Sequence, residues 1–494
     1  MKTTPSPNNN QSLDPTNWDE ARQLMHQMID DAVDYLATIR ERPIWQPMPE
    51  EVQASFATPV PKTASSAQTV YADFQQNVLP YPMGNVHPKF WAWYMGSGTL
   101  SGALGDFWAS IMNPNLGGGN HAANKVEAQV VNWMKEIMGF PQTSSGLLVS
   151  GGSMANFVGL TVARNVKAGY DIRQKGFQPN HKMVVYASSE VHSCNQKALE
   201  LLGMGTESLV KIPVNSDYTI NIQALQEQIQ KDRAVGLHPI CVIGTSGTVN
   251  TGAIDNLNAL ADLCEAEDLW FHIDGAIGAV AMLSDTVRPQ LAGIERADSV
   301  AIDLHKWLHM PFEAACILVK DGKGHKKTFS LIPEYLAKNT RGIAAGDLWF
   351  SEYGLQLSRR FRALKIWMSL KEHGTERFGN MITKNVNQAH YLAELIADSS
   401  DMEQLAPIGL DILCFRYNPG GMTLDELNAI NKEIKVQLEE SGRSAPGYTT
   451  LNNRYCLRVA IANHRSRRED FEELLDDIRQ IGITLRKAMP VLSQ

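Results

Sequence analysis

The chain has 494 residues, of which 44% are hydrophobic and 20% are charged, and its formal net charge at pH 7 is -8. This length exceeds what one hydrophobic core usually fills, so we expect roughly two or three structural units. The ordinary composition excludes a small disulfide-stabilised scaffold, and the acidic balance argues against a nucleic-acid-binding protein.

The cysteines and the N-terminal residues indicate the compartment. The six cysteines lie tens of residues apart without a CxxC pair, which favours neither a zinc site nor a disulfide framework and fits a reducing cytoplasm. The N-terminus lacks a charged segment followed by an apolar run, and no stretch of about 18 apolar residues occurs. We therefore expect no export signal and no membrane span. Residues 1–13 are polar and rich in Asn and Pro, which predicts a disordered tail.

Residues 14–95 are interpreted as an N-terminal arm. Apolar residues recur at helical spacing from Asn17 to Ile39, which predicts a helix. Pro43, Pro47 and Pro49 then break the pattern, and an extended segment is expected. Because this arm has too many prolines to form its own core, we expect it to wrap around a second copy in a homodimer.

Residues 96–377 are assigned to a large unit and residues 378–494 to a smaller α+β unit. In the large unit short β-branched runs alternate with amphipathic stretches such as Ile222–Arg233 and Leu257–Glu267, which is typical of a mostly parallel sheet covered by helices. Its expected strands are Leu147–Val149, Met183–Ala187, Leu209–Pro213, Ile240–Thr245, Trp270–Asp274, Ser299–Asp303 and Ala314–Val319. The smaller unit has expected strands at Asp411–Tyr417 and Cys456–Ala462.

The segment Ser150-Gly151-Gly152-Ser153 reads as a glycine turn between a strand and a helix that runs through Arg164. Such a turn aims free backbone N–H groups and the positive helix end at an anion, for which a phosphate is the natural occupant. Taken alone, it is equally an ordinary strand-to-helix connection. It matches neither GxxxxGK[ST] nor GxGxxG, which disfavours ATP and NAD.

Two charged residues end neighbouring predicted strands. Asp274 closes an apolar strand at the edge where open α/β sheets bind ligands, although alone it is as readily a helix cap. Lys306 follows the next strand, and burying its ammonium is costly unless its pKa falls or it is covalently engaged. An imine-forming lysine, an acid for the pyridine nitrogen and a phosphate turn are what a pyridoxal-5'-phosphate (PLP) enzyme requires.

The chain resembles the group II PLP-dependent decarboxylases, the family of aromatic-L-amino-acid decarboxylase. This resemblance implies an α/β fold of the fold-type-I PLP-dependent transferases, with a mostly parallel seven-stranded sheet, an N-terminal helical arm and a small C-terminal α+β domain. It runs from about Asp19 to the C-terminal helix. The motifs that carry it, in the family's order, are Arg42-Pro43, His87–Ala92, Ser150–Ser153, Ser189–Ser193, His272–Ala276, His305–Trp307 and Leu357–Arg362.

Four roles around the cofactor ring are implied by the resemblance. Lys306 matches the lysine that forms the imine, and Asp274 matches the partner of the pyridinium nitrogen. Ala276 is expected on one face of the ring and His192 on the other. Without the motif, His192 is more readily a surface histidine.

The phosphate side of the site is also implied by the resemblance. Gly152 and Ser153 match phosphate contacts, Ser246 falls where the family has a threonine near the cofactor, and His305 precedes the lysine as in the family. Asp303 replaces an asparagine of the animal enzymes, which puts a phosphate contact there in doubt because two anions repel.

No metal site is predicted. His305 and His309 have a spacing that can bind zinc on a helix. However, no glutamate follows His305 as in HExxH, and the cofactor interpretation already uses that histidine.

The reaction suggested by the resemblance is decarboxylation of an L-amino acid to the amine and CO2. Tyr335 matches a loop tyrosine that protonates the α-carbon, and Gly342–Gly346 has the composition of a flexible lid. Relatives with phenylalanine at this position resemble aldehyde-forming oxidative enzymes, so Tyr335 favours simple decarboxylation. The open alternatives are aminotransfer, oxidative decarboxylation and a PLP-binding homologue without catalysis.

The substrate is expected to be an aromatic amino acid, with a non-aromatic one as the alternative. Trp93 and Tyr94 supply aromatic surface near the matched pocket segment. Gly96 replaces a threonine expected near the substrate, and Asn113–Asn120 lacks the phenylalanine that a partner subunit would contribute. The pocket is therefore expected to be roomier or more polar than in the family.

Overall fold

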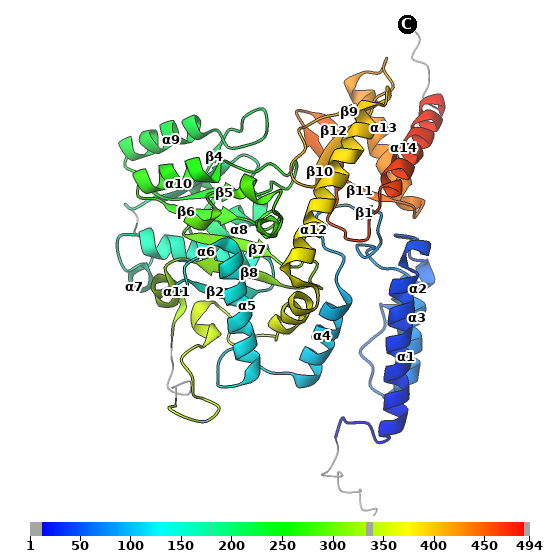
Figure 1. Cartoon of the computed structure of the whole chain (residues 1–494), viewed down its shortest axis with the longest axis horizontal. Coiled ribbons are helices and arrows are strands. Elements are labelled where there is room, and N and C mark those ends of the chain that lie inside the picture. The colour runs from blue at the N-terminus through cyan, green and yellow to red at the C-terminus, as the bar shows by residue number, and fades with distance from the viewer. Residues whose placement is uncertain (1–11, 179, 332–338, 489–494) are drawn as a thin grey trace, which may run out of the picture.

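The computed structural model describes residues 12–178, 180–331 and 339–488, whose strands form a seven-stranded and a five-stranded sheet. We call the parts built on these sheets the seven-stranded unit and the five-stranded unit. Figure 1 shows them side by side, with the N-terminal helices below the five-stranded unit. Of the tail expected at residues 1–13, residues 1–11 lie outside the described residues. Tyr335 also lies outside them.

The seven-stranded sheet has the order β2-β8-β7-β6-β5-β3-β4, and only β8 runs antiparallel to its neighbours. This confirms the predicted mostly parallel sheet. Its central strands are buried along their whole length, because helices cover both faces. The strands are β2 (Ser145–Val149), β3 (Met183–Ser188), β4 (Leu209–Ile212), β5 (His238–Thr245), β6 (Trp270–Asp274), β7 (Ser299–Asp303) and β8 (Ala315–Val319).

The helices of this unit follow the predicted periodicity. Helix α6 begins directly at the glycine turn and packs against β5 to β8, whereas α9 and α10 pack against β5. The helix that follows β3 begins at Ser193, so the segment before it reaches the carboxyl ends of the strands. The helices are α5 (Ala122–Met138), α6 (Gly152–Lys167), α7 (Ile172–Lys175), α8 (Ser193–Leu201), α9 (Ile222–Ala234), α10 (Leu257–Ala266) and α11 (Gly322–Phe329).

The five-stranded sheet has the order β1-β11-β12-β10-β9 and a hydrophobic core of its own. The two predicted strands β10 and β12 are confirmed, while β1, β9 and β11 were not anticipated. Strand β1 comes from the N-terminal arm and pairs in parallel with β11. The elements are β1 (Phe90–Trp91), β9 (Met402–Gln404), β10 (Ile412–Tyr417), β11 (Ala445–Leu451), β12 (Arg454–Ala460), α13 (Leu424–Glu440) and α14 (Glu469–Ala488).

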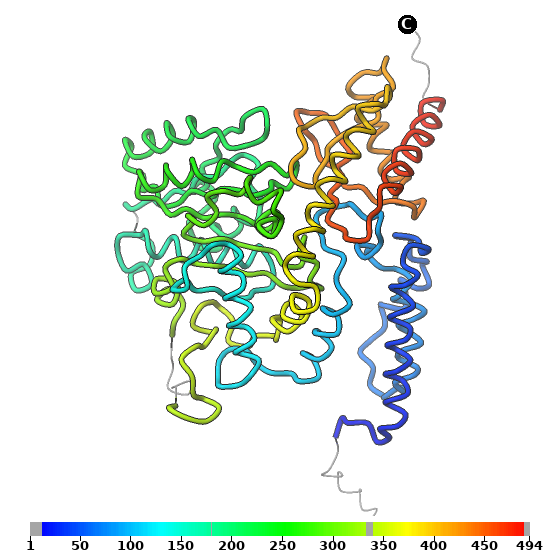
Figure 2. Tube along the Cα trace, viewed as in Figure 1, coloured from blue at the N-terminus to red at the C-terminus, as the bar shows by residue number. Residues whose placement is uncertain are grey.

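Helix α12 (Ala363–Ala397) joins the two units, as the yellow tube in Figure 2 shows. It runs through residue 377, where the sequence suggested a boundary, and it bends at Gly374, whose φ of 70° departs from helical geometry. One helix therefore contributes side chains to both hydrophobic cores.

The N-terminal arm is more helical than the sequence indicated. The predicted helix is confirmed as α1 (Trp18–Ala37), but the expected extended segment contains α2 (Glu50–Ser55) and α3 (Ala67–Asn77). The Tyr71 hydroxyl on α3 donates to Asp31 Oδ2 on α1 at 2.7 Å, which holds these helices side by side. Helix α4 (Leu100–Met112) follows. No helix in the described ranges is long and apolar enough to cross a membrane.

Candidate active site

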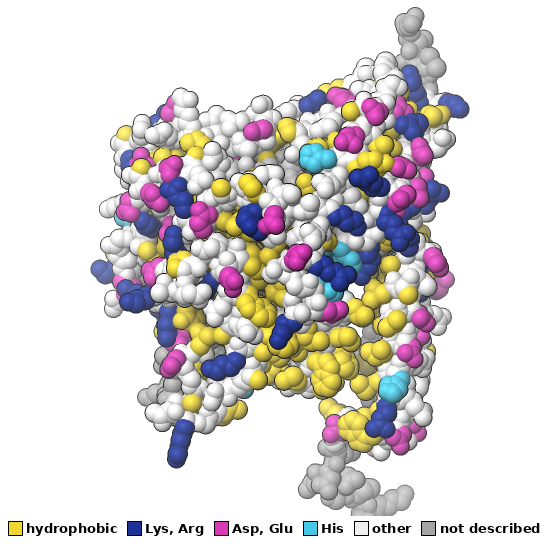
Figure 3. Space-filling model, in the orientation of Figure 1, with side chains coloured by type: hydrophobic (Ala, Val, Ile, Leu, Met, Phe, Trp, Pro, Cys, Tyr) yellow, Lys and Arg dark blue, Asp and Glu magenta, His cyan; other side chains and the backbone are white. Residues whose placement is uncertain are grey.

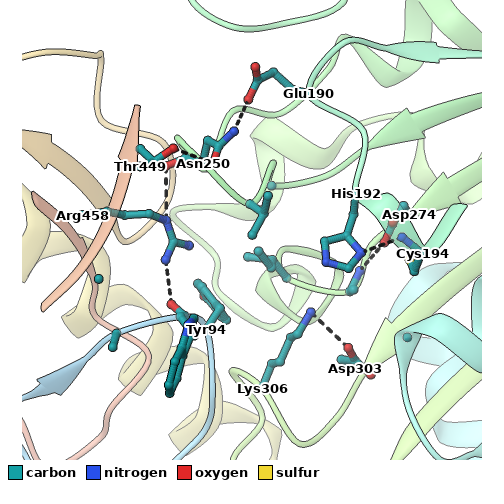
Figure 4. A pocket seen from close by; sticks show the side chains of 18 of the residues that line it. Tyr94, Glu190, His192, Cys194, Asn250, Asp274, Asp303, Lys306, Thr449 and Arg458 are labelled. Atoms are coloured by element: carbon teal, nitrogen blue, oxygen red, sulfur yellow. Dashed lines mark hydrogen bonds and ion pairs between the residues drawn. The ribbon is translucent and has the colours of Figure 1, made fainter. Parts of the chain in front are cut away.

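A cavity of about 690 Å³ lies at the carboxyl ends of β5, β6 and β7. One wall comes from the seven-stranded unit, and the opposite wall comes from β11, β12 and the segment after β1. Figure 4 shows Lys306 pointing into this space, with His192 and Asp274 on one side and Arg458 on the other. We call the side of Lys306 and Asp274 the near end and the side of Arg458 the far end.

Lys306 forms an ion pair at the near end. Its Nζ lies 3.1 Å from Asp303 Oδ2, and the Asp303 side chain is 4% exposed at the end of β7. The other oxygen, Asp303 Oδ1, has no hydrogen-bond partner among the described residues. The carboxylate therefore compensates the lysine charge that burial would otherwise penalise.

His305 is a neutral neighbour of this ion pair. Its ring stacks on Phe312 with 4.4 Å between centroids, and its Nδ1 accepts the N–H of Ala314 at 3.2 Å. Burial lowers the pKa of His305. The remaining nitrogen, Nε2, lies 3.6 Å from Asp303 Oδ1 and carries the proton in the neutral ring.

Asp274 is fixed at the end of β6 by two donors. Asn195 Nδ2 donates to Asp274 Oδ2 at 2.8 Å, and the N–H of Ala276 donates to Oδ1 at 3.3 Å. Asn195 was missed by sequence reasoning. Its position three residues after His192, on the same face of α8, was the available signal.

His192 is the N-cap residue of α8. Its Nδ1 accepts the N–H of Cys194 at 3.2 Å, which fixes the ring orientation. Burial lowers the pKa of His192, and the nearby Asp274 carboxylate partly offsets this effect. The ring is therefore neutral at pH 7 and presents Nε2–H toward the cavity.

The glycine turn brings backbone rather than side chains to the near end. Gly151, Gly152 and Ser153 line the cavity at the N-terminus of α6. A Cβ on Gly152 would lie 2.7 Å from Asp303 Oδ2, so no larger residue fits there. The first N–H groups of α6 are thus available to an anion such as a phosphate.

A chain of buried hydrogen bonds connects α6 with β6 and β7 behind the near end of the cavity. Trp270 Nε1 donates to Ser299 Oγ at 2.8 Å, and Ser299 Oγ lies 2.7 Å from His272 Nδ1. His272 Nε2 lies 2.8 Å from Asn156 Oδ1 on α6. Burial lowers the pKa of His272 to about 4, so the neutral ring accepts at Nδ1 and donates at Nε2. This chain fixes α6 relative to β6 and β7.

Two residues named from the sequence do not line the cavity. Thr245 lines it instead of Ser246, because successive side chains of an extended segment point to opposite sides. Within the described chain, Thr245 Oγ1 is buried without a partner. Gly96 lies behind Lys306, where its N–H donates to His305 O at 3.0 Å and a Cβ would lie 2.2 Å from Lys306 O.

Trp93 and Tyr94 do line the cavity, on the far side from Asp274. The Tyr94 hydroxyl donates to Asp411, with 2.9 Å to Oδ1. Burial raises the pKa of Asp411 to about 7.

Sequence reasoning missed Arg458, which is 3% exposed in β12 at the far end. Its Nη1 donates to Trp93 O at 2.7 Å and its Nε to Asn250 O at 3.2 Å. Its Nη2 is buried with no partner in the part of the chain that the structure describes. An arginine inside an apolar strand carries the same signal of costly burial that pointed to Lys306.

The two histidines with zinc-like spacing face different surroundings. His305 faces Asp303, while His309 Nδ1 accepts the N–H of Ser97 at 3.3 Å and its ring packs against His464. Within the described ranges, no group of three or more His, Cys, Asp or Glu side chains is arranged to hold a metal ion.

The near end contains the groups that PLP requires. Lys306 supplies an amine, Asp274 supplies a fixed carboxylate, and Gly152 opens the N-terminus of α6. Thr245 adds a hydroxyl that has no hydrogen-bond partner within the described ranges. The donor set fits the cofactor, and together with the sheet topology it defines a fold-type-I PLP enzyme.

Comparisons with known proteins identify the family. The model described as "Pyridoxal-dependent decarboxylase conserved domain" matches residues 49–418. The chain is 34% identical over 480 residues to an aromatic-L-amino-acid decarboxylase of Bacillus atrophaeus, covering 96% of this chain and 98% of that protein. It is 30% identical over 459 residues to tyrosine decarboxylase 4 of Petroselinum crispum, covering 90% and 89%.

Solved structures share the fold. The tryptophan decarboxylase of Catharanthus roseus in complex with L-tryptophan superposes with a TM-score of 0.85 at 24% identity, covering 96% of this chain and 100% of that one. Oryza sativa TDC with PLP and tryptamine gives a TM-score of 0.88 at 24% identity and the same coverage. The chain therefore belongs to the pyridoxal-dependent decarboxylases, as a lyase that uses PLP to decarboxylate an amino acid.

Proposed function

We propose that the enzyme removes CO2 from an aromatic L-amino acid and releases the amine. The observation that carries this proposal is that Lys306 and Asp274 line the same cavity as the aromatic residues Trp93 and Tyr94. The relatives named aromatic-L-amino-acid and tyrosine decarboxylase support an aromatic substrate.

The near-end residues hold the cofactor and orient it. In this proposal Lys306 would hold PLP through its amine, the N-terminus of α6 at Gly152 and Ser153 would receive the phosphate, and Asp274 would hold a proton on the pyridine nitrogen. Bound PLP supplies an electron-accepting ring. Asn195 fixes the orientation of the Asp274 side chain, because it donates to one carboxylate oxygen at 2.8 Å.

Two side chains bracket the ring in this proposal. His192, fixed by the Cys194 N–H, would cover one face, and Ala276, whose N–H is bound to Asp274, would pack against the other. Only the bond held perpendicular to the ring breaks, so the reaction depends on positioning. A neutral His192 lets a carboxylate leave as CO2 without a cation to hold it back.

Asp303 serves Lys306 rather than the phosphate in this proposal. It faces Gly152, where a second anion would be repelled, but its Oδ2 already lies 3.1 Å from Lys306 Nζ. Asp303 can therefore form an ion pair with the lysine whenever its nitrogen is free. In this proposal the aspartate that stands in place of the asparagine of the animal enzymes serves the lysine and not the phosphate.

The experiment that tests the function starts from the purified protein with PLP. Its absorbance is measured before and after borohydride, and it is then given a panel of aromatic, acidic and aliphatic amino acids. We expect CO2 and the matching amine from aromatic substrates. Release of CO2 only from acidic or aliphatic substrates would overturn the aromatic assignment, and a keto acid without CO2 would indicate aminotransfer.

Tyr335 distinguishes decarboxylation from the oxidative alternative. If its phenol protonates the α-carbon, Tyr335→Phe should keep PLP binding and CO2 release, because neither step uses the hydroxyl. Amine output should fall by at least about 100-fold, the usual lower bound for a lost general acid. With dissolved O2 as the two-electron oxidant and water supplying the aldehyde oxygen, the product should then shift to aldehyde, ammonia and hydrogen peroxide. A coupled peroxidase assay should detect the peroxide. Unchanged amine output without peroxide would assign the proton to another group.

We also propose that the enzyme works as a cytoplasmic homodimer. All six cysteines are unpaired, which fits a reducing compartment. Helix α1 buries none of its residues, and Figure 3 shows hydrophobic side chains gathered over α4. The exposed apolar residues on α4 are Leu100, Leu104, Phe107, Trp108, Ile111 and Met112. A monomer that stays fully active at high dilution would refute the dimer.

A further inference from the structure

Asn250 bridges the two units across the cavity. It lies on the loop between β5 and α10, and its side chain uses both of its polar groups. Asn250 Nδ2 donates to Glu190 Oε2 at 2.9 Å, on the seven-stranded unit. Asn250 Oδ1 accepts the hydroxyl of Thr449 at 2.9 Å, on β11 of the five-stranded unit. The amide therefore joins the segment that carries His192 to the opposite wall.

The backbone of Asn250 fixes Arg458. Its carbonyl accepts Arg458 Nε at 3.2 Å and Cys414 Sγ at 3.3 Å, from two strands of the five-stranded sheet. With Trp93 O at 2.7 Å from Nη1, the guanidinium is held at two of its three nitrogens. The third nitrogen, Nη2, has no hydrogen-bond partner among the residues that the structure describes, and the arginine lines the cavity wall.

The rest of this loop packs so tightly against the five-stranded unit that a shift of Asn250 would also shift that unit. A Cβ on Gly252 would lie 2.0 Å from Gly409 O, and a Cβ on Gly247 would lie 2.9 Å from Leu410 Cδ1. Both Gly252 and Gly247 have positive φ, of 74° and 96°. Residues 247–252 therefore make direct backbone contact with the five-stranded unit, and a shift there would move the far wall.

We propose that Asn250 is a positioning residue that fastens the five-stranded unit to the seven-stranded unit and keeps Arg458 aimed into the far end. Asn250 has no hydrogen bond to Lys306, Asp274 or His192. Its contribution is therefore to substrate binding at the far end and not to cofactor binding at the near end. This inference rests on the proposed function for its kinetic assay.

The first test is Asn250→Ala in the PLP-loaded enzyme. KM for the best amino acid of the panel should rise about tenfold, which is the loss of one or two hydrogen bonds, while kcat changes less. PLP affinity should stay within about twofold. Thr449→Val, which removes only one of the bonds, should give a smaller rise in KM and serves if the alanine variant does not fold.

A matched control is Asn215→Ala. Asn215 Nδ2 donates to Thr219 Oγ1 at 3.1 Å, so this variant also deletes an Asn–Thr bond, but within a loop outside the cavity. Its KM and kcat should match those of the unmodified enzyme. If Asn250→Ala behaves like Asn215→Ala, Asn250 fastens nothing and the proposal is overturned.

The second test reverses the direction of one bond. Asn250→Asp places a carboxylate against Glu190 and should raise KM more than the alanine variant, because like charges in contact repel. Adding Glu190→Gln restores a donor and an acceptor in the opposite order. The double variant should recover KM to within about threefold of the unmodified enzyme. A double variant no better than Asn250→Asp would overturn the proposal.

Hydrogen exchange separates this inference from the substrate assignment. In Asn250→Ala the amides of β11 and β12 should exchange faster than in Asn215→Ala, whatever amino acid is decarboxylated. Failure of the aromatic assignment would leave this difference intact. Unchanged exchange in β11 and β12 would overturn the fastening role even if aromatic substrates are confirmed.

Discussion

The two ends of the cavity are built in different ways. At the near end, His192, Asp274 and Lys306 lie at the ends of three strands of one sheet or within a few residues after them. At the far end, Trp93, Asn250 and Arg458 come from the N-terminal arm, a loop of the seven-stranded unit and a strand of the five-stranded unit. The near end is thus set by local chain geometry, and the far end by how the units pack.

Lys306→Ala is the change with the largest expected effect on the near end. The variant should fold, release no CO2 above background and retain no PLP after borohydride reduction, because the imine nitrogen is gone. Mass spectrometry of the reduced protein measures this. Lys435→Ala, which removes another lysine that lines the cavity, should still be labelled. PLP fixed to the Lys306→Ala chain would show that the lysine is misassigned.

Asp274→Asn tests whether the carboxylate at the near end holds a proton on the pyridine nitrogen of the cofactor. A neutral amide cannot hold a proton on the pyridine nitrogen, so kcat should fall by about 10² to 10³, the usual cost of one preorganised charge partner. Asn195→Ala, which leaves the carboxylate but removes its donor at 2.8 Å, should cost about tenfold. Steady-state kinetics with saturating PLP measure both. Near-normal turnover in Asp274→Asn would remove this residue from the mechanism.

The same contrast explains what the sequence could predict. Lys306 and Asp274 were recognised because each is a charge at the end of an apolar strand, and strand order then brings them together. Arg458 carries a similar signal inside β12, but its partners are the carbonyls of Trp93 and Asn250, and a carbonyl has no sequence signature. Its role was therefore visible only in the folded chain.

The strands missed by sequence reasoning have equally physical causes. Strand β1 has two residues and β9 has three, too few to show a period of two. Strand β11 contains Pro446 and Gly447, which argue against a strand. The signal that was available is Asn452-Asn453, where φ values of 50° and 64° form the tight turn between β11 and β12.

Asp411, which accepts the Tyr94 hydroxyl beside the far end, should make the folding stability depend on pH. Burial raises the pKa of Asp411 to about 7, whereas an unfolded aspartate titrates near 4. Between these values the folded state binds a proton that the unfolded state does not, so the contribution of Asp411 to stability falls as pH rises. Asp411→Asn should remove this loss and still accept the Tyr94 hydroxyl.

The measurement for Asp411 is urea unfolding of both proteins at several pH values. The unfolding free energy of Asp411→Asn, relative to the unmodified enzyme, should rise by about 2–3 kcal/mol between about pH 5 and pH 8. The hydrogen bond from Tyr94 and, more weakly, the nearby positive charge of Arg458 act against this rise in the pKa of Asp411. A difference that does not change with pH would show that Asp411 is ionised in the folded state across this range.

The smallest expected effect comes from removing the hydroxyl of Thr245 or of Ser246 at the near end. The family pattern pointed to Ser246, but Thr245 lines the cavity. Both hydroxyls are buried without partners among the described residues, so removing either should leave folding stability unchanged or slightly higher. Only Thr245 Oγ1 can gain a partner when the cavity is filled.

Thr245→Val should therefore lower kcat/KM about fivefold, the value of one neutral hydrogen bond, and Ser246→Ala by less than about twofold. Steady-state kinetics give kcat/KM, and thermal unfolding checks the stability of both variants. A larger loss of kcat/KM in Ser246→Ala than in Thr245→Val would show that Ser246, as in the family pattern, and not Thr245 faces the near end.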